Sequence, residues 1–289
     1  MFDRVEAFYR PESVPEVLRL LQRSKGQARM VAGGTDLVVE GDRSVRFLID
    51  LTRAGLTYIR SRDTTCVIGA TTTLADLEES TAIHALAGGL LSRAAAACGS
   101  VQNRNLATLG GNLAHGSPAA DMATPLLALD ASVVVADGEG RHKMPLAEYF
   151  GRAWQNGASH ALLIEVRVPM PPQNGRCGWS FQKFGRTEVD LSLVNAAAGL
   201  QLDARGRVKW ARLALGAVAA APFRALPVES LMAGREFDHS LLAEAGEEVM
   251  REVQPIADLR ASEEFRRELS RVVAGRALEE CAARAGCSL

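Results

Sequence analysis

The most informative part of the chain is Asn105-Leu106-Ala107-Thr108-Leu109-Gly110-Gly111-Asn112-Leu113-Ala114-His115-Gly116-Ser117-Pro118-Ala119-Ala120-Asp121. A shorter stretch, Val31-Ala32-Gly33-Gly34-Thr35-Asp36-Leu37, has a similar pattern: an apolar segment, a glycine pair and a small polar residue. Glycine permits positive φ and lets backbone N–H groups approach a ligand closely. Successive N–H groups in such turns form a concave anion site. The two glycine pairs therefore predict either a phosphate-binding site or two purely structural turns.

Polar side chains near these glycines are candidates for the same site. Thr35, Thr108 and Asn112 offer side-chain donors. Asp121, ten residues after Gly111, either caps the apolar helix that follows or accepts hydrogen bonds from sugar hydroxyls. His115 lies between them and either lines the pocket or has a structural role.

Several common site types lack support in the sequence. The P-loop pattern GxxxxGK[ST] does not occur, and no GxGxxG follows the first expected strand. Gly116-Ser117-Pro118 is not a nucleophile elbow, and the histidines show no HxH or HxxxH spacing. We therefore expect no metal site in this chain.

Composition is that of an ordinary globular protein. The 289 residues are 47% hydrophobic and 23% charged, with a net charge of −1, which argues against nucleic-acid binding. No apolar run reaches the roughly 18 residues of a membrane span, and the N-terminus lacks a signal-peptide pattern. The five cysteines have no CxxC pair, so we expect free thiols and a cytoplasmic protein.

Hydrophobic periodicity predicts a mixed α+β chain. We expect a helix from Ser13, with Glu16 at capping-box spacing, and one buried helix over 84–98. Strands are expected at 29–32, 47–50, 57–60, 66–70, 133–135 and 162–168, with helices at 74–79 and 122–129. Antiparallel strands are expected at 179–184, 194–202 and 208–215, followed by helices at 226–232, 239–252 and 263–283.

The best domain boundary is the segment Pro169-Met170-Pro171-Pro172-Gln173-Asn174-Gly175, because proline continues neither a helix nor a central strand. Beyond it, Lys183 is followed by Arg186 and Asp190. Lys183 either reaches a ligand or shares a surface ion-pair network with those two residues, and the residues alone favour the surface network.

Three motifs together resemble one family. The two glycine loops, and Phe181-Gln182-Lys183-Phe184-Gly185-Arg186 with Asp190 and Val194, are similar to the FAD-binding (medium) subunits of molybdenum hydroxylases, of the carbon monoxide dehydrogenase and xanthine dehydrogenase type. The resemblance covers essentially the whole chain, and the motifs occur in the same order. No segment resembles the four-cysteine insertion of the benzoyl-CoA reductase type.

The resemblance implies a fold and a domain division. Residues 1–172 would be an FAD-binding domain of the PCMH/vanillyl-alcohol-oxidase type, with subdomains of about 1–55 and 56–172. Residues 177–289 would be a flavoprotein C-terminal domain with a small antiparallel sheet and helices.

The resemblance also implies cofactor-binding roles. The two loops would hold the FAD pyrophosphate, Asp121 its sugar region, and Leu162 or Leu163 and Lys183 would lie near the flavin ring. The full set of expected FAD-binding residues is Val31, Ala32, Gly33, Gly34, Thr35, Asp36, Leu37, Thr108, Gly110, Gly111, Asn112, His115, Ala120, Asp121, Leu162, Leu163 and Lys183.

By the same resemblance, a large partner carries the molybdenum cofactor and a small partner carries 2Fe-2S clusters. Substrate hydroxylation would take place on the large partner, so the resemblance implies no catalytic residue in this chain. This chain would pass electrons from those clusters to an external acceptor, within a dimer of heterotrimers. Two alternatives stay open: a stand-alone flavin oxidase of the vanillyl-alcohol-oxidase fold, and a non-flavin anion-binding scaffold.

Overall fold

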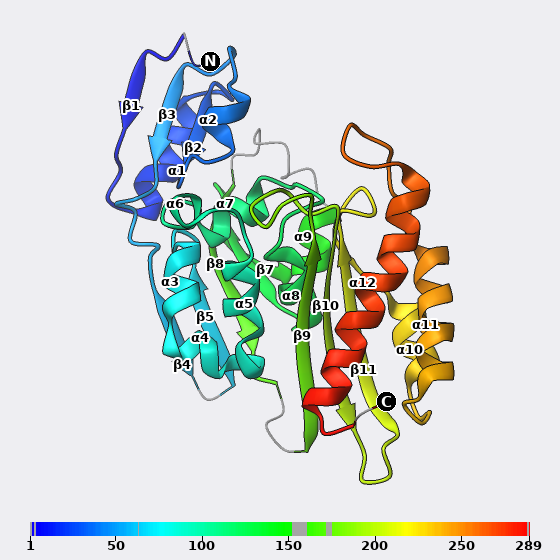
Figure 1. Ribbon diagram of the computed structural model, residues 1–289. Helices are drawn as coiled ribbons and strands as arrows, with labels where there is room; N and C mark the ends of the chain where they lie inside the picture. The colour runs from blue at the N-terminus through cyan, green and yellow to red at the C-terminus, as the bar shows by residue number, and fades with distance from the viewer. Residues whose placement is uncertain (1, 3, 63, 152–160, 172–174, 288) are drawn as a thin grey trace. The chain divides into compact units, whose positions relative to one another are not determined.

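The computed structural model describes the chain except residues 1, 3, 63, 152–160, 172–174 and 288 (Figure 1). The described residues form two compact units, each built from separate pieces of the sequence. The first unit comprises 1–77, 100–116 and 130–169, and the second comprises 78–99, 117–129 and 170–289.

The first unit contains a small parallel sheet of order β1-β3-β2 and a five-stranded antiparallel sheet of order β4-β5-β8-β6-β7. The small sheet consists of β1 (Ala7–Tyr9), β2 (Ala28–Val31) and β3 (Phe47–Asp50). The larger sheet consists of β4 (Ile59–Arg62), β5 (Thr65–Gly69), β6 (Ser132–Ala136), β7 (Arg141–Pro145) and β8 (Leu162–Pro169).

A single apolar core joins the two sheets of this unit. Val17 and Leu21 of helix α1 (Val14–Arg23) pack with Ile49 of β3 and with Val134 and Ile164 of the larger sheet. Burial of these side chains is the main stabilising contribution here. The shorter helices of this unit are α2 (Leu37–Glu40), α6 (Val101–Arg104), α7 (Leu109–Ala114) and α9 (Leu146–Gly151); α3 (Leu74–Glu79) begins in it.

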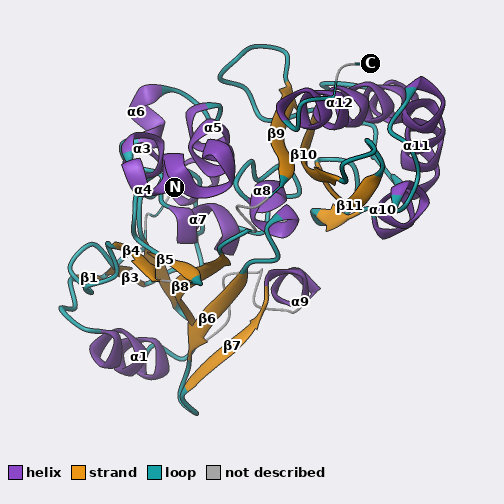
Figure 2. Cartoon of the chain, turned by 90° about the horizontal axis from the view of Figure 1, so that it is seen from below, coloured by secondary structure: helices purple, strands orange, loops and turns teal. Residues whose placement is uncertain are grey.

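The second unit is built on an antiparallel sheet of order β12-β11-β10-β9. Helix α12 packs on β9 and β10, and α8 packs on β10 and β11 from the opposite side (Figure 2). The strands are β9 (Arg176–Phe184), β10 (Val194–Leu202), β11 (Val208–Gly216) and β12 (Phe223–Arg224). The helices are α4 (Thr81–Ala85), the 3-10 turn η1 (Leu86–Gly89), α5 (Leu90–Ala96), α8 (Ala123–Ala128), α10 (Leu226–Met232), α11 (His239–Glu252) and α12 (Glu263–Arg284).

Two expectations about helices were wrong. The single helix over 84–98 is broken by three consecutive left-handed residues, Ala87, Gly88 and Gly89, whose φ angles are 49°, 56° and 79°. The Gly88-Gly89 pair was the signal for this break, since glycine readily adopts positive φ. Ser13 occupies the N-cap of α1 without a side-chain cap bond; instead Glu16 Oε2 accepts from the N–H of Glu12 at 3.0 Å.

The proposed domain boundary lies partly outside the described residues, because 172–174 are among those not described. The compact units do not follow chain order, since 78–99 and 117–129 pack with the C-terminal portion. The division into 1–172 and 177–289, with a subdivision near residue 55, therefore stays a prediction about family domains. Among the described residues, no helix has the length and apolar character needed to cross a bilayer.

Candidate functional site

The two glycine loops meet inside the first unit. A Cβ atom at Gly33 would lie 1.9 Å from the carbonyl oxygen of Leu106 and 2.5 Å from its carbonyl carbon. Real Cβ atoms do not approach backbone so closely, so only glycine fits at this position. The prediction that these segments come together is therefore correct at Gly33, where the close approach requires glycine.

The first loop presents a row of backbone N–H groups without partners. Among the described residues, no hydrogen bond uses the N–H of Gly33, Gly34, Thr35, Asp36 or Leu37. Gly34 has φ +71° and Asp36 is in the right-handed helical region, so the chain turns between them. Consecutive N–H groups in a turn of this kind make a concavity suited to an anion.

The second glycine pair has a different conformation from the expected turn. Gly110 and Gly111 lie in the first turn of α7, where Thr108 is the N-cap and its Oγ1 accepts from the Gly111 N–H at 3.0 Å. The Gly110 N–H donates to the Ala70 carbonyl at 2.8 Å, and that of Asn112 to the Thr108 carbonyl at 2.9 Å. The expectation that these N–H groups are free for an anion was wrong, because protein acceptors already use them.

The two glycines of α7 differ in the space around them. A Cβ at Gly110 would meet Ala70 at 2.6 Å, so this glycine allows α7 to pack against the end of β5. A Cβ at Gly111 would meet only Thr108 Oγ1 within 4 Å, at 2.9 Å. At Gly111 the Thr108 hydroxyl is therefore the only close neighbour in the direction of a side chain, whereas Gly110 is required for packing.

His115 links the two loops at their far ends. Its Nε2 lies 3.3 Å from Oε1 of Glu40, the last residue of α2. The His115 side chain is partly exposed, and that of Glu40 is largely exposed. The contact brings the end of α7 close to the helix that follows Thr35 and Asp36.

Asp121 in the second unit is a buried hydrogen-bonding centre. Its Oδ2 lies 2.7 Å from Lys183 Nζ, and its Oδ1 accepts from Ser192 Oγ at 2.5 Å and Asn195 Nδ2 at 3.0 Å. The N-cap of α8 is Met122, with no side-chain cap bond, so the capping role expected for Asp121 was wrong. A carboxylate has about four lone-pair sites, and these three bonds leave one of them open.

Lys183 is buried as well, so its assignment to a surface network was wrong. Its side chain is 9% exposed, and Nζ also donates to the Ala97 carbonyl at 2.8 Å. Arg186 and Asp190 do form the expected exposed pair, at 3.3 Å.

The remaining candidate residues differ in how far they are buried. Val31 and Ala32 are half-buried at the end of β2, and Ala120 is 4% exposed just before Asp121. Leu162 is 1% exposed and belongs to the core of the first unit, whereas Leu163 is the next residue of β8 and is 6% exposed. The placement of either leucine near a flavin ring stays a prediction.

The hydrogen-bond partners of Asp121 were not predicted from the sequence. Asn195 is fully buried near the start of the largely apolar strand β10, and its Oδ1 accepts from Thr124 Oγ1 at 3.0 Å. An amide side chain inside a mostly apolar strand was the available signal, because a buried polar group needs hydrogen-bond partners. Ser192 gave no comparable signal, since serine is common before a strand.

Comparison with protein families covers nearly the whole chain. Residues 2–171 match the FAD binding domain in molybdopterin dehydrogenase, and residues 179–281 match the CO dehydrogenase flavoprotein C-terminal domain.

Individual relatives agree with this assignment. The chain is 32% identical over 289 residues to the 6-hydroxypseudooxynicotine dehydrogenase complex subunit alpha of Paenarthrobacter nicotinovorans, covering 98% of this chain and 95% of the relative. It is 29% identical over 298 residues to the xanthine dehydrogenase FAD-binding subunit of Escherichia coli O157:H7, covering all of both. A chain of the carbon monoxide dehydrogenase structure from Hydrogenophaga pseudoflava superposes with a TM-score of 0.92 at 29% identity, covering 98% and 99%.

The cofactor of this family fits the residues present. The unbonded N–H groups of 33–37 can donate to a diphosphate, and each hydrogen bond to a charged group contributes about 1.5–3 kcal/mol. In the second loop, a Cβ at Gly111 would meet only Thr108 Oγ1 within 4 Å. The chain belongs to the FAD-binding (medium) subunits of the molybdenum hydroxylase family, oxidoreductase flavoproteins of the carbon monoxide dehydrogenase and xanthine dehydrogenase type.

Proposed function

We propose that this chain is the electron-transfer subunit of a molybdenum-containing hydroxylase, passing electrons from 2Fe-2S clusters of a partner to an external acceptor. Bound FAD would supply the redox chemistry, since a flavin accepts electrons singly or in pairs. The chain's part is to bind the flavin, fix its orientation and tune its environment.

The observation that carries this proposal is the row of unpartnered N–H groups at Gly33 to Leu37, held against the backbone of Leu106. A turn with five unused donors is costly unless solvent or a ligand satisfies them. We propose that they bind the FAD pyrophosphate, with the Thr35 side chain beside them and the open backbone of Gly111 leaving room.

The other candidate residues have supporting roles in the proposal. Thr108 fixes the start of α7, and Asn112 and His115 follow along that helix and at its end. The assignments of Ala120 and Asp121 to the sugar region, and of Leu162, Leu163 and Lys183 to the flavin ring, rest on the family resemblance. Asp121 retains one lone-pair site for such a bond after its three protein donors.

We further propose the partners and location. Relatives are named as a dehydrogenase complex subunit and as an FAD-binding subunit, which supports a complex with a large molybdenum-cofactor subunit and a small 2Fe-2S subunit. A dimer of heterotrimers is the proposed assembly. The five cysteines are free thiols, which supports a cytoplasmic location.

The proposal is tested by expressing the chain alone and then with its genomic neighbours. Each preparation is analysed for acid-released FAD, iron and molybdenum, and by its visible spectrum. We expect one FAD per chain in the complex, together with iron and molybdenum on co-purifying subunits. When a substrate that reduces the molybdenum subunit is added, the flavin absorbance should bleach, and it should do so only when the iron–sulfur subunit is present.

Two results would contradict the proposal in different ways. A chain that oxidises a small substrate by itself, with flavin bleaching and no partner, would indicate the stand-alone oxidase. A chain that carries no flavin in either preparation would indicate the anion-binding scaffold.

A further inference from the structure

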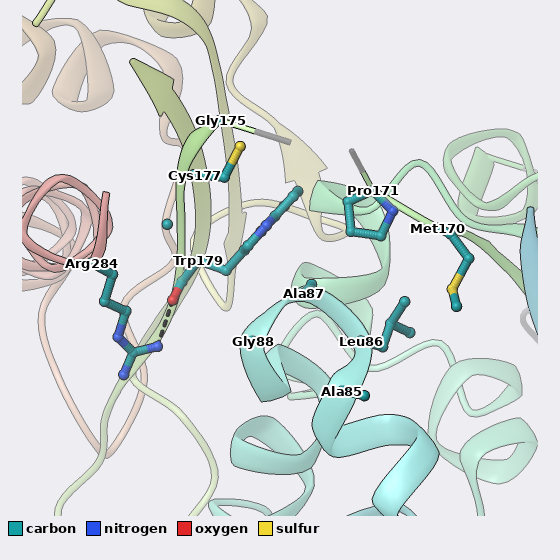
Figure 3. Close-up of a pocket in the computed structure, with 11 residues that line it drawn as sticks. Ala85, Leu86, Ala87, Gly88, Met170, Pro171, Gly175, Cys177, Trp179 and Arg284 are labelled. Atoms are coloured by element: carbon teal, nitrogen blue, oxygen red, sulfur yellow. Dashed lines mark hydrogen bonds between the residues drawn. The ribbon is translucent and has the colours of Figure 1, made fainter. Parts of the chain in front are cut away.

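A cavity of about 580 Å³ lies within the second unit, beside the broken helix (Figure 3). This volume is within the range of small-molecule sites in proteins. The residues of its wall that matter here are Leu86, Gly88, Met170, Pro171, Trp179 and Arg284. Apolar and polar atoms contribute about equally to the surface of the cavity, and among the described lining residues Arg284 contributes the one cationic side chain.

Two guanidinium groups converge beside the cavity. Arg284 Nη1 and Arg93 Nη2 both donate to the carbonyl oxygen of Trp179, at 2.6 Å and 3.0 Å (Figure 3 shows the first bond). Two like charges on one acceptor repel each other unless a negative charge compensates them.

Glu280 is the carboxylate that compensates them in part. Its Oε1 lies 2.5 Å from Arg284 Nη2, and its Oε2 accepts from Gln182 Nε2 at 2.6 Å and from Ser180 Oγ. One carboxylate therefore pairs with Arg284 and also accepts from two neutral donors. Burial, followed by the nearby Arg284, lowers the pKa of Arg93, and Glu280 acts in the opposite direction.

The turn formed by Ala87 and Gly88, which also lines the cavity, has an unfavourable backbone conformation. Ala87 has φ +49°, a left-handed conformation in which the Cβ of a non-glycine residue comes too close to the following carbonyl oxygen. Arg93 Nη1 donates to the carbonyl of Gly88 in the same turn. The turn and the arginine pair therefore form one connected structure around the cavity.

The lining favours binding over catalysis. Cys177 is its nucleophilic side chain, and burial raises the pKa of that thiol, which keeps it protonated and unreactive at neutral pH. No acid–base pair is present among the lining residues described.

We propose that this cavity binds a small monocarboxylate with an apolar body, its carboxylate on the Arg284 guanidinium and its body against Leu86, Met170 and Pro171. Arg284 uses two of its five N–H donors in the contacts above, so donors remain for a ligand. Trp179 precedes Lys183 by four residues on β9, a separation of roughly 13 Å along the strand. The site is therefore distinct from the Lys183–Asp121 pair.

The test uses the full-length chain and ligand-observed fluorine NMR. The probes are 4-fluorobenzoate and 6-fluorohexanoate, with the neutral 4-fluorobenzamide as the reference compound. The variants are Arg284→Gln, which removes the charge, and Ala85→Phe, which fills the cavity from its exposed rim. Arg276→Gln is the matched control, because it removes an exposed arginine from the same helix.

We expect at least one carboxylate to bind the unaltered chain more tightly than the amide. Arg284→Gln should weaken this binding about tenfold or more, and Ala85→Phe should abolish it, while Arg276→Gln leaves it unchanged. Equal binding to the unaltered chain and Arg284→Gln would contradict the proposal, as would no binding of either carboxylate. FAD content, measured on the same samples, should be the same in all variants, so a failure here is separable from a failure of the flavin assignment.

Discussion

Lys183 Nζ lies 2.7 Å from Asp121 Oδ2, and the two side chains are only 9% and 4% exposed. The two charged groups also have neutral hydrogen-bond partners. The Ala97 carbonyl accepts from the lysine ammonium, and Ser192 and Asn195 donate to the Asp121 carboxylate. A buried ion pair is tolerated when such additional hydrogen bonds satisfy both partners. The pair therefore ties β9 to the segments that carry residues 97 and 121 within the second unit.

Removal of one partner should be strongly destabilising. Asp121→Ala leaves the Lys183 ammonium buried without its counter-charge, and the expected loss is about 3–5 kcal/mol. Asp190→Ala is the matched control, because it removes the exposed Arg186–Asp190 pair and should cost less than about 1 kcal/mol. Urea unfolding measures both, and equal losses in the two variants would contradict the buried role of Asp121.

The close approach of Gly33 to Leu106 predicts a large effect from a single methyl group. Gly33→Ala places a Cβ 1.9 Å from the Leu106 oxygen, so the two loops must separate. We expect the free energy of unfolding to fall by about 2 kcal/mol or more, because the added methyl group overpacks the contact. Gly275→Ala is the comparison, because that position in α12 has no neighbour within 4 Å. Alanine is the better helix former by about 1 kcal/mol, so this variant should be stabilised. Thermal unfolding of both variants checks the prediction, and a neutral Gly33→Ala would refute the loop contact.

The left-handed turn at Ala87 predicts a stabilising substitution. Ala87→Gly removes the steric cost of φ +49°, and we expect a gain of about 0.5 kcal/mol after the entropy lost by glycine. The same substitution at Ala243, exposed in the middle of α11, should instead cost about 1 kcal/mol. The urea midpoint should rise for Ala87→Gly and fall for the variant at residue 243. A lower midpoint for Ala87→Gly would show that the turn is not strained.

Glu165 predicts a pH dependence of stability in the first unit. Burial alone would raise the pKa of this carboxyl, but hydrogen bonds from Tyr58 (2.7 Å) and Arg167 (2.7 Å) outweigh it and lower the pKa. The folded state therefore binds fewer protons here than the unfolded state. The stabilisation is fully present above the unfolded pKa of about 4.3 and is lost as the pH falls through the lower folded value.

Glu165→Gln should remove this part of the acid sensitivity. Comparison of urea midpoints at pH 7 and between pH 3 and 4 should show a smaller decrease for the variant than for the unaltered chain. Glu279→Gln, an exposed glutamate of α12, is the control and should behave like the unaltered chain. An unchanged pH profile in Glu165→Gln would contradict the assigned hydrogen bonds. Since burial and Glu165 raise the pKa of Tyr58 to about 12, the same variant should also titrate Tyr58 at lower pH.

Much of the fold could be predicted because its elements carry strong local signals. The helices at 226–232 and 239–252 and the strands at 47–50 and 194–202 have the bounds expected from periodicity. Strand β1 and the helical state of Gly110 could not be predicted, because both depend on tertiary contacts. Ala7 pairs with Phe47, forty residues away, and Gly110 bonds to Ala70.

Close backbone contacts at the candidate site could be predicted from the sequence, but its hydrogen bonds could not. The glycine pairs indicated close backbone approach, and the structure shows it at Gly33 and Gly110. Which N–H groups remain free depends on partners distant in sequence, such as Ala70 and Thr72, and local patterns do not encode them. The burial of Lys183 is of the same kind, since its partner Asp121 is 62 residues away.

The most direct test of the central claim is the FAD content of Gly111→Val. A branched side chain at this position fills the open backbone face of α7, whose nearest neighbour is Thr108 Oγ1. Acid-released FAD per chain is measured after purification, with circular dichroism and thermal unfolding to establish that the variant is folded. We predict one FAD for each unaltered chain in the complex and almost none for the folded variant. A folded Gly111→Val that retains stoichiometric FAD would contradict the proposed site.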